Sequence, residues 1–321
     1  MNDLTTSHSS LPAKNVRSQP LDELNRQASA HTFSIDDVPW ATPLSNEKNW
    51  IAESLVTVRY LPSYKSLTAE QRLRYNHLYA LSVCEQFIWF EQGLICPIIN
   101  KWIANSDLPE DFRLALKFFN EEELRHSSMF RRLLKKADHR AYSTGDFRLY
   151  KLKPLHKAFF NSVIRWPQIF LAWIWMAIYF EERTLFISRH YHDDASVDQT
   201  FRRCHQLHMI DEARHLQIDQ YLLKYFYDSA SPFKRRLAGK MFTALLRAYT
   251  SPKNTSRNIL RQMRLEKCGP QNSLIKLHKD VAQLGHSRQF VEDFFGQGAM
   301  KRTRILLSQY PEMKKALSLI E

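Results

Sequence analysis

Two matched five-residue segments constrain the fold of this chain more than any other feature of its sequence. One reads Glu-Glu-Leu-Arg-His from residue 122, and the other reads Asp-Glu-Ala-Arg-His from residue 211. Residues three apart share one face of an α-helix, so the second acid and the histidine of each segment project together. Two such Glu-x-x-His pairs, each joined by a glutamate from another helix, hold two metal ions in four-helix bundles. The segments therefore predict a helical bundle with a two-metal carboxylate site, whose ligands include Glu123, His126, Glu212 and His215.

A glutamate lies level with each segment on the preceding predicted helix. Glu91 precedes Glu123 by 32 residues, and Glu181 precedes Glu212 by 31 residues. The sequences around the two earlier glutamates, Ile-Trp-Phe-Glu-Gln and Ile-Tyr-Phe-Glu-Glu, also resemble each other. The midpoint of each pair falls in a polar break between two predicted helices, so the paired residues face each other across antiparallel hairpins. Glu91 and Glu181 are therefore predicted to complete the site.

Glu85 is an alternative to Glu91 in the first of these helices. The midpoint between Glu85 and Glu123 falls inside the predicted helix rather than in a break. Glu91 is therefore preferred, and Glu85 is expected to support the ligands or to substitute for one of them.

The second segment is preceded by an additional histidine. His208, Glu212 and His215 are spaced so that they form one continuous stripe along a helix. The first segment has Phe119 at the position that corresponds to His208. The sequence therefore predicts an asymmetric site in which one metal ion has a further imidazole ligand.

The residues that flank the predicted ligands have a supporting role in this interpretation. A metal-bound imidazole usually needs an acceptor for the N–H on its other ring nitrogen. The pseudo-twofold symmetry of the two segments pairs the leading acid of each segment with the histidine of the other. This gives Asp211 with His126 and Glu122 with His215, while Arg125 and Arg214 balance the negative charge.

Single features of this kind usually have a structural explanation. A lone Glu-x-x-His on a helix is usually a solvated pair, and a lone histidine such as His208 on an apolar helix usually packs in the core. The aromatic residues next to the predicted ligands are also more typical of a core than of a substrate pocket. Two copies of the segment, each with an adjacent acid and a level glutamate, favour metal binding over these explanations.

Composition and periodicity favour an all-α fold. Only 7 glycines occur among 321 residues, and strand-like alternation is weak throughout. Residues 1–35 are expected to form a disordered tail, and residues 36–70 an irregular wrap. A single domain is predicted over 36–321, with its bundle core at about 69–227. Helical patterns span residues 69–104, 109–137, 155–190 and 197–227, with further helices over 232–321.

Charge and cysteine spacing exclude several classes of function. The net charge is +13, but the basic residues are spread along helical segments without a nucleic-acid-binding motif, so no nucleic acid partner is predicted. The longest apolar run, residues 166–180, is too short to span a bilayer, so no integral membrane segment is predicted. The 4 scattered cysteines and the polar N-terminus predict a cytoplasmic protein. The sequence leaves open whether the chain forms a homodimer.

The complete pattern resembles the p-aminobenzoate N-oxygenase family of arylamine oxygenases. The pattern consists of the two level glutamates, the two acid-Glu-x-Arg-His segments and the histidine four residues before the second ligand glutamate. The resemblance covers roughly residues 80–220, and the stretch Trp40–Leu44 and the run from Tyr75 to Glu91 are also similar. Glu122 stands where the family motif prefers aspartate. The resemblance implies a ferritin-like four-helix bundle with additional N- and C-terminal helices.

By this resemblance the chain is a non-haem di-iron oxygenase, with manganese as the alternative metal. It would use O₂ to oxygenate the nitrogen of a small arylamine. Electrons would come from an external ferredoxin or flavin reductase, because the sequence has no glycine-rich dinucleotide-binding loop. The alternatives are a di-metal hydroxylase or oxidase acting on a carbon substrate and a non-catalytic iron-binding or storage protein, since the fold does not determine the reaction. The implied ligands are Glu91, Glu123, His126, Glu181, His208, Glu212 and His215.

Overall fold

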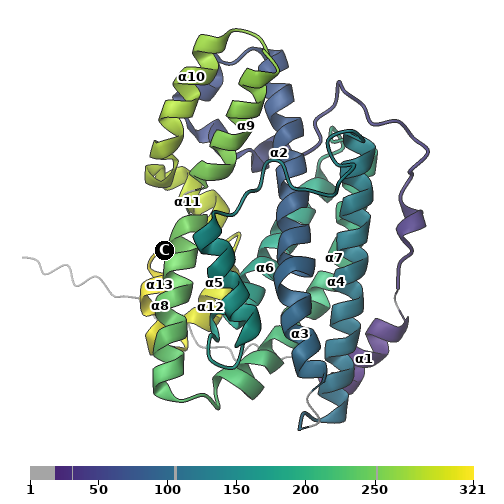
Figure 1. The fold of residues 1–321 in the computed structure, drawn as a ribbon, viewed down its shortest axis with the longest axis vertical. Coiled ribbons are helices and arrows are strands. Elements are labelled where there is room, and N and C mark those ends of the chain that lie inside the picture. Colours follow the sequence, from purple (N-terminus) through teal and green to yellow (C-terminus); the bar gives the residue numbers. More distant parts are fainter. Residues whose placement is uncertain (1–18, 31, 105–106, 251) are drawn as a thin grey trace, which may run out of the picture.

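The computed structural model describes residues 19–30, 32–104, 107–250 and 252–321 (Figure 1). All regular elements in these residues are helices, and β pairing is limited to an isolated bridge between Asn49 and Val197. The predicted all-α fold is confirmed. Within the same ranges, no helix is both long enough and apolar enough to cross a membrane.

Four long helical segments form a bundle (Figure 1). α2 and α3 pack against α4, α6 packs against α7, and α4 contacts α7, which confirms the predicted ferritin-like bundle. The first segment is α2 (Ala69–Phe90), which continues through a π-helical turn (Glu91–Ile95) into α3 (Cys96–Ile103). The other three are α4 (Glu110–Ala137), α6 (Ala172–Asp193) and α7 (Gln199–Leu222), which ends in a π-helical turn (Leu223–Tyr227).

Two of these helices begin at side chains that cap free backbone N–H groups. The hydroxyl of Thr68 accepts from the backbone N–H of Gln71 at 3.1 Å, and the side chain of Gln71 accepts from the backbone N–H of Thr68 at 3.2 Å. Thr68 is therefore the N-cap of α2. Asp198 caps α7 by accepting from the backbone N–H of Thr200 at 2.8 Å.

The predicted third helix is two helices in the structure. α5 spans Pro154–Arg165, and α6 begins only at Ala172. Pro167 lies in the break, and a proline both lacks a backbone N–H and disfavours helical geometry at the preceding residue. Trp166 accordingly has φ −129° and ψ 58°. The indole Nε1 of Trp173 donates to the carbonyl of Pro167 at 3.1 Å, which fixes the turn between the two helices.

The N-terminal segment contains a helix where the sequence predicts a disordered tail. α1 spans Leu21–Ala30 and packs mainly against α4, with Leu21, Leu24 and Ala28 buried. The side-chain amide of Asn25 donates to the carbonyl of Asp111 at 2.9 Å. The prediction is wrong for these residues because apolar side chains at helical spacing can dock a short helix on a bundle. Residues 1–18 and 31 of the predicted tail lie outside the described residues.

The segment between α1 and α2 is irregular, as predicted, and the C-terminal helices cover one side of the bundle. α8 and α12 pack on α6, and α9 packs on α2, to the left of the bundle in Figure 1. That residues 36–321 fold as a single domain stays a prediction. The irregular segment between α1 and α2 contains short 3-10 turns at Ile35–Asp37, Glu53–Leu55, Thr57–Tyr60 and Pro62–Ser66. The C-terminal helices are α8 (Pro232–Tyr249), α9 (Lys253–Leu265), α10 (Gln271–Asp280), α11 (Arg288–Phe295), α12 (Lys301–Ser308) and α13 (Lys314–Leu317).

Candidate metal centre

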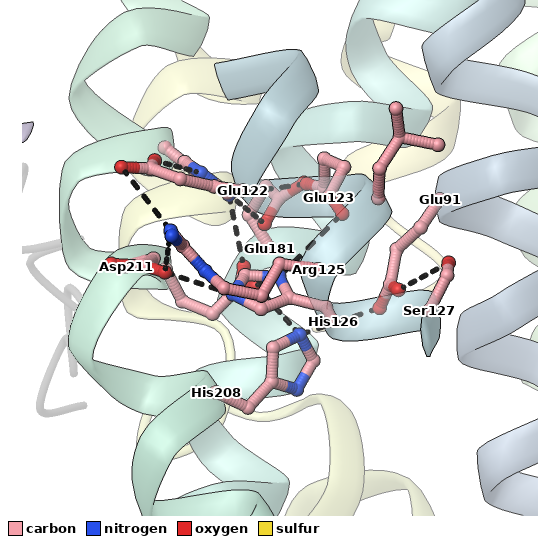
Figure 2. A network of polar contacts seen from close by, with 12 residues as sticks. Glu91, Glu122, Glu123, Arg125, His126, Ser127, Glu181, His208 and Asp211 are labelled. Atoms are coloured by element: carbon pink, nitrogen blue, oxygen red, sulfur yellow. Dashed lines mark hydrogen bonds and ion pairs between the residues drawn. The ribbon is translucent and has the colours of Figure 1, made fainter. Parts of the chain in front are cut away.

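The seven residues predicted as ligands converge in the interior of the bundle (Figure 2). They come from the π-helical turn after α2 and from α4, α6 and α7, and each residue is buried, with no more than 3% of its surface exposed. Their side chains form two groups, and within each group the ligand-type atoms lie within 4.8 Å of one another. One group contains Glu91, His126 and His208, and the other contains Glu123, Glu181, Glu212 and His215.

Two carboxylates of the second group, those of Glu123 and Glu212, also face the first group. Oε1 of Glu212 is 2.7 Å from Nε2 of His208 and 3.3 Å from Nδ1 of His126, whereas Oε2 of Glu212 is 3.6 Å from Nδ1 of His215. Oε1 of Glu123 is 3.1 Å from Nδ1 of His215, and its Oε2 is 3.8 Å from Nδ1 of His126. Each of these two carboxylates therefore presents one oxygen to each group, which is the arrangement of carboxylates that bridge two metal ions.

Glu91 and Glu181 each lie beside one group. Oε1 of Glu91 is 3.3 Å from Nε2 of His208, and Oε2 of Glu181 is 3.6 Å from Nδ1 of His215. The hydroxyl of Ser127 donates to Oε2 of Glu91 at 3.0 Å and so fixes the carboxylate (Figure 2). Glu91 also opens the π-helical turn, and Pro97 follows it with no N–H for a regular helical bond. Single π-helical turns of this kind inside α-helices are frequent at functional sites.

The leading acid of each segment pairs with the histidine of the other segment, at the ring nitrogen that faces away from the centre. Oδ2 of Asp211 is 3.0 Å from Nε2 of His126, and Oε2 of Glu122 is 2.9 Å from Nε2 of His215. This is the crossed pairing that the pseudo-twofold symmetry predicts, and it leaves Nδ1 of both rings directed at the centre. Arg214 bonds Asp211 at 2.8 Å and also pairs with Glu122, and Arg125 approaches Asp211 at 3.3 Å.

The family of the chain follows from comparison with known proteins. The family described as p-aminobenzoate N-oxygenase AurF matches residues 14–295, which include all seven buried residues. The chain belongs to this family. A comparison with curated proteins found no match. The AurF family is a family of di-iron oxygenases, so the paired acidic and imidazole groups in this chain occupy a fold that is associated with oxygen chemistry.

The AurF-like centre does not include Glu85. Oε1 of Glu85 accepts hydrogen bonds from the hydroxyl of Tyr142 at 2.7 Å and from the backbone N–H of Arg148 at 2.9 Å. Its Oε2 accepts from the backbone N–H groups of Leu149 at 2.9 Å and Tyr150 at 2.6 Å. The expectation that Glu85 supports or replaces a ligand is therefore corrected. The carboxylate instead organises the connection between α4 and α5, and its acceptor capacity is used there.

Replacing Glu85 by alanine is expected to destabilise the fold without removing the metal ligands. The substitution leaves buried donors of the connection without an acceptor, which should lower the free energy of unfolding by about 3 kcal/mol. Unfolding by urea measures this loss, and the exposed Glu70→Ala on the same helix is the control, with a change below about 1 kcal/mol. Lower iron content per folded chain at unchanged stability would contradict the assignment.

Several buried atoms of the centre have no hydrogen-bond partner among the described residues. They are Nδ1 of His126 and His215, both ring nitrogens of His208, both carboxylate oxygens of Glu123 and Oε2 of Glu212. An unpaired buried polar group costs about 1–3 kcal/mol, so a folded protein seldom keeps several together without a ligand. Imidazole nitrogen and carboxylate oxygen are donors that suit iron and manganese. The residues present therefore fit a pair of divalent cations.

The pKa shifts of residues in the centre also favour the binding of cations. Burial raises the pKa of Glu181, and the neighbouring carboxylates of Glu212 and Glu123 raise it further. Burial opposes protonation of His208, but the carboxylates of Glu212 and Glu91 outweigh it and raise the pKa of this imidazole to about 10. The buried negative charge of the carboxylates has to be balanced by positive charge, and bound cations would supply it.

Sequence patterns do not reveal two further features around the centre. Phe33, from the segment predicted to be disordered, stacks on the ring of His126 with centroids 5.9 Å apart, and the Arg125 guanidinium lies 4.9 Å above its ring. The other feature is a cavity of about 70 Å³ next to the centre. Phe87 and Phe180 line it, and the ring of Phe87 lies 5.2 Å from that of His208. Both features join segments that are far apart in the sequence, so no local signal marks them.

Proposed function

We propose that this chain is a non-haem di-iron oxygenase that oxygenates the nitrogen of a small arylamine. The observation that supports it most is the buried, asymmetric set of four carboxylates and three imidazoles, in which Glu123 and Glu212 each face both groups. In this proposal Glu91, His126 and His208 would hold one iron ion, Glu181 and His215 would hold the other, and Glu123 and Glu212, which face both groups, would contribute to both.

The overall reaction consumes the amine, O₂, two electrons and two protons, and it yields a hydroxylamine and water. Two iron ions, when bound, supply the redox chemistry that activates O₂. The electrons come from an external ferredoxin or flavin reductase, because the sequence lacks a dinucleotide-binding loop.

The protein's own residues position the reactants and exclude water. Asp211 and Glu122 keep the proton on Nε2 of their histidine partners, so that Nδ1 is free for a metal ion. Arg214 and Arg125 offset the charge of these acids. The aromatic cavity beside Phe87 and Phe180 gives an arene a dry environment next to the centre.

Arg183 is the charged residue that lines this cavity. Its Nη1 donates to the carbonyl of Phe294 at 3.0 Å, and its guanidinium packs against the rings of Phe294 at 4.7 Å and Phe186 at 5.0 Å. Tyrosines, rather than carboxylates, are the ionisable groups that interact with it among the described residues. A fixed cation without an acidic partner favours a substrate that carries a carboxylate or carbonyl oxygen.

Replacing Arg183 by methionine is therefore expected to weaken the binding of p-aminobenzoate by about tenfold or more, since a hydrogen bond to a charged group contributes about 1.5–3 kcal/mol. Arg183→Lys should retain part of the affinity, and binding of uncharged aniline should change little. Calorimetric titration measures these affinities. Equal losses for p-aminobenzoate and aniline would assign Arg183 a structural role only.

Product analysis tests the reaction itself. The iron-loaded chain, supplied with reductant and O₂, is expected to convert p-aminobenzoate to N-oxygenated products that mass spectrometry identifies. Hydroxylation at carbon would favour the alternative of a carbon-directed di-metal hydroxylase. Iron oxidation that ends in a mineral core without organic product would favour a storage protein, and either result contradicts the proposed N-oxygenation.

A further inference from the structure

A second and larger cavity lies outside the centre and the cavity beside Phe87 and Phe180. It has a volume of about 390 Å³ and opens between α5, α8 and α9. Its walls are largely apolar, with Phe159, Phe160 and Leu245, and its polar groups include Lys151 and Asn254. Cavities of about 300–1,000 Å³ with mostly apolar walls and a few polar groups are typical small-molecule sites. We refer to it as the outer cavity, and to the cavity beside Phe87 and Phe180 as the inner cavity.

The two cavities are adjacent in the fold. Gln86, Tyr249 and Pro252 line both of them. The ring of Tyr249 lies 4.9 Å from that of Phe180, which precedes Glu181 of the centre. The side chains of these shared residues therefore lie between the two cavities, and a molecule that occupied both would pass beside them.

The size of the inner cavity limits what it can hold. Its volume of about 70 Å³ accommodates roughly five to seven water-sized groups. An aromatic ring with its amino group nearly fills such a space. Any substantial substituent on that ring has to lie in the outer cavity.

The charges of both cavities have one sign. No aspartate or glutamate is among the described residues that line either cavity, whereas Arg183 lines the inner one and Lys151 lines the outer one. Lys151 is an exposed residue of the outer cavity lining, and none of the ion pairs found among the described residues includes it. A positively charged route with aromatic walls favours an aromatic ligand that carries negative charge.

We propose that the two cavities form one substrate site, and that the substrate is an extended anionic aromatic amine. Its amino end occupies the inner cavity, and its acidic distal part lies in the outer cavity near Lys151. This inference rests on the proposed function, because it assigns the amino end to the oxygenation centre. It adds that the natural substrate is larger than p-aminobenzoate and that the outer cavity selects it.

Two probes that share the same amino end test the proposal. They are p-aminobenzoate and p-aminobenzoyl-glutamate, which carries an additional acidic tail. Calorimetry on the iron-loaded chain without reductant is expected to show about tenfold tighter binding of the longer probe. Ala244→Trp, which fills the outer cavity from an exposed position on α8, should remove this gain and leave the affinity for p-aminobenzoate within about twofold. Arg236→Trp, at an exposed position of α8 outside the cavity, is the matched control.

Charge reversal provides a second variant that does not depend on cavity filling. Lys151→Glu should weaken binding of p-aminobenzoyl-glutamate by about tenfold while sparing p-aminobenzoate. Equal affinity of the two probes, or a gain that survives Ala244→Trp, overturns the proposal, and so does failure of both probes to bind. The predicted binding pattern without N-oxygenated product would leave the shared site standing and refute the proposed function. N-oxygenation of p-aminobenzoate without tighter binding of p-aminobenzoyl-glutamate would support the proposed function and refute the shared site.

Discussion

Replacing Glu212 by alanine is expected to remove both iron ions and to abolish amine oxygenation. Oε1 of Glu212 faces His126 and His208, and Oε2 faces His215, so this single side chain serves both metal positions. Loss of the bridge leaves each ion with fewer ligands and leaves the three imidazoles without their shared counter-charge. Iron content should fall from about two ions per chain to near zero.

Metal analysis and circular dichroism of the purified variant measure this effect. Glu121→Ala is the matched control, because Glu121 is an exposed glutamate beside the buried ones on α4. It should keep the iron content and activity of the parent chain. A Glu212→Ala protein that folds and still holds two iron ions would contradict the assignment of Glu212 as a bridge.

Replacing Asp211 by asparagine is expected to weaken iron binding by about 10–100-fold while the fold persists. The carboxylate of Asp211 receives the ring N–H of His126 at 3.0 Å and is held by Arg214 at 2.8 Å. An asparagine removes the negative charge and can present an amide N–H to the ring, which favours the wrong tautomer. Competition with a chelator of known affinity measures the loss.

The controls separate this effect from a general change in charge. Asp193→Asn, at an exposed position near the end of α6, removes the same charge and should leave iron affinity unchanged. Glu122→Gln removes the equivalent acceptor of His215 and should cause a loss similar to that of Asp211→Asn. Unaltered iron affinity in both variants would show that the two acids do not orient the histidines for a metal.

The buried cluster could be predicted from the sequence because helical geometry fixes it. Side chains three, four or seven residues apart share a face, and residues equidistant from a hairpin turn lie level with each other. The spacing of Glu91 to Glu123 and of Glu181 to Glu212 therefore sufficed to assemble residues from different helices. The same symmetry gave the crossed pairs between acids and histidines.

The features that the sequence did not reveal depend on tertiary contacts. Glu85 lies one helical segment before Glu91 and is the alternative ligand in the sequence, but its partners are the hydroxyl of Tyr142 and backbone N–H groups of a loop more than fifty residues away. The position of Phe33 on His126 depends on the path of an irregular segment. The break at Pro167 divides the helical pattern predicted over residues 155–190, because the residues after the proline form turns before α6 begins.

The cavities could not be predicted from the sequence either, because they also depend on tertiary contacts. The inner cavity is lined by residues of α2, α6, α8 and α11, and no periodic pattern links Phe87 or Arg183 to residues from the C-terminal helices. The metal centre is read from repeats within the bundle, whereas substrate choice depends on how the additional helices close over it. For this reason the sequence supports the oxygenation chemistry of the chain better than it identifies the substrate.

Anomalous diffraction at the iron absorption edge, from crystals of the iron-loaded chain, tests directly whether two iron ions bind at this centre. Two peaks are expected about 3.5–4 Å apart, both between the carboxylates of Glu123 and Glu212. One peak should lie beside His126 and His208, and the other beside His215. A single peak, no peak, or peaks away from these residues would contradict a two-iron centre in this chain.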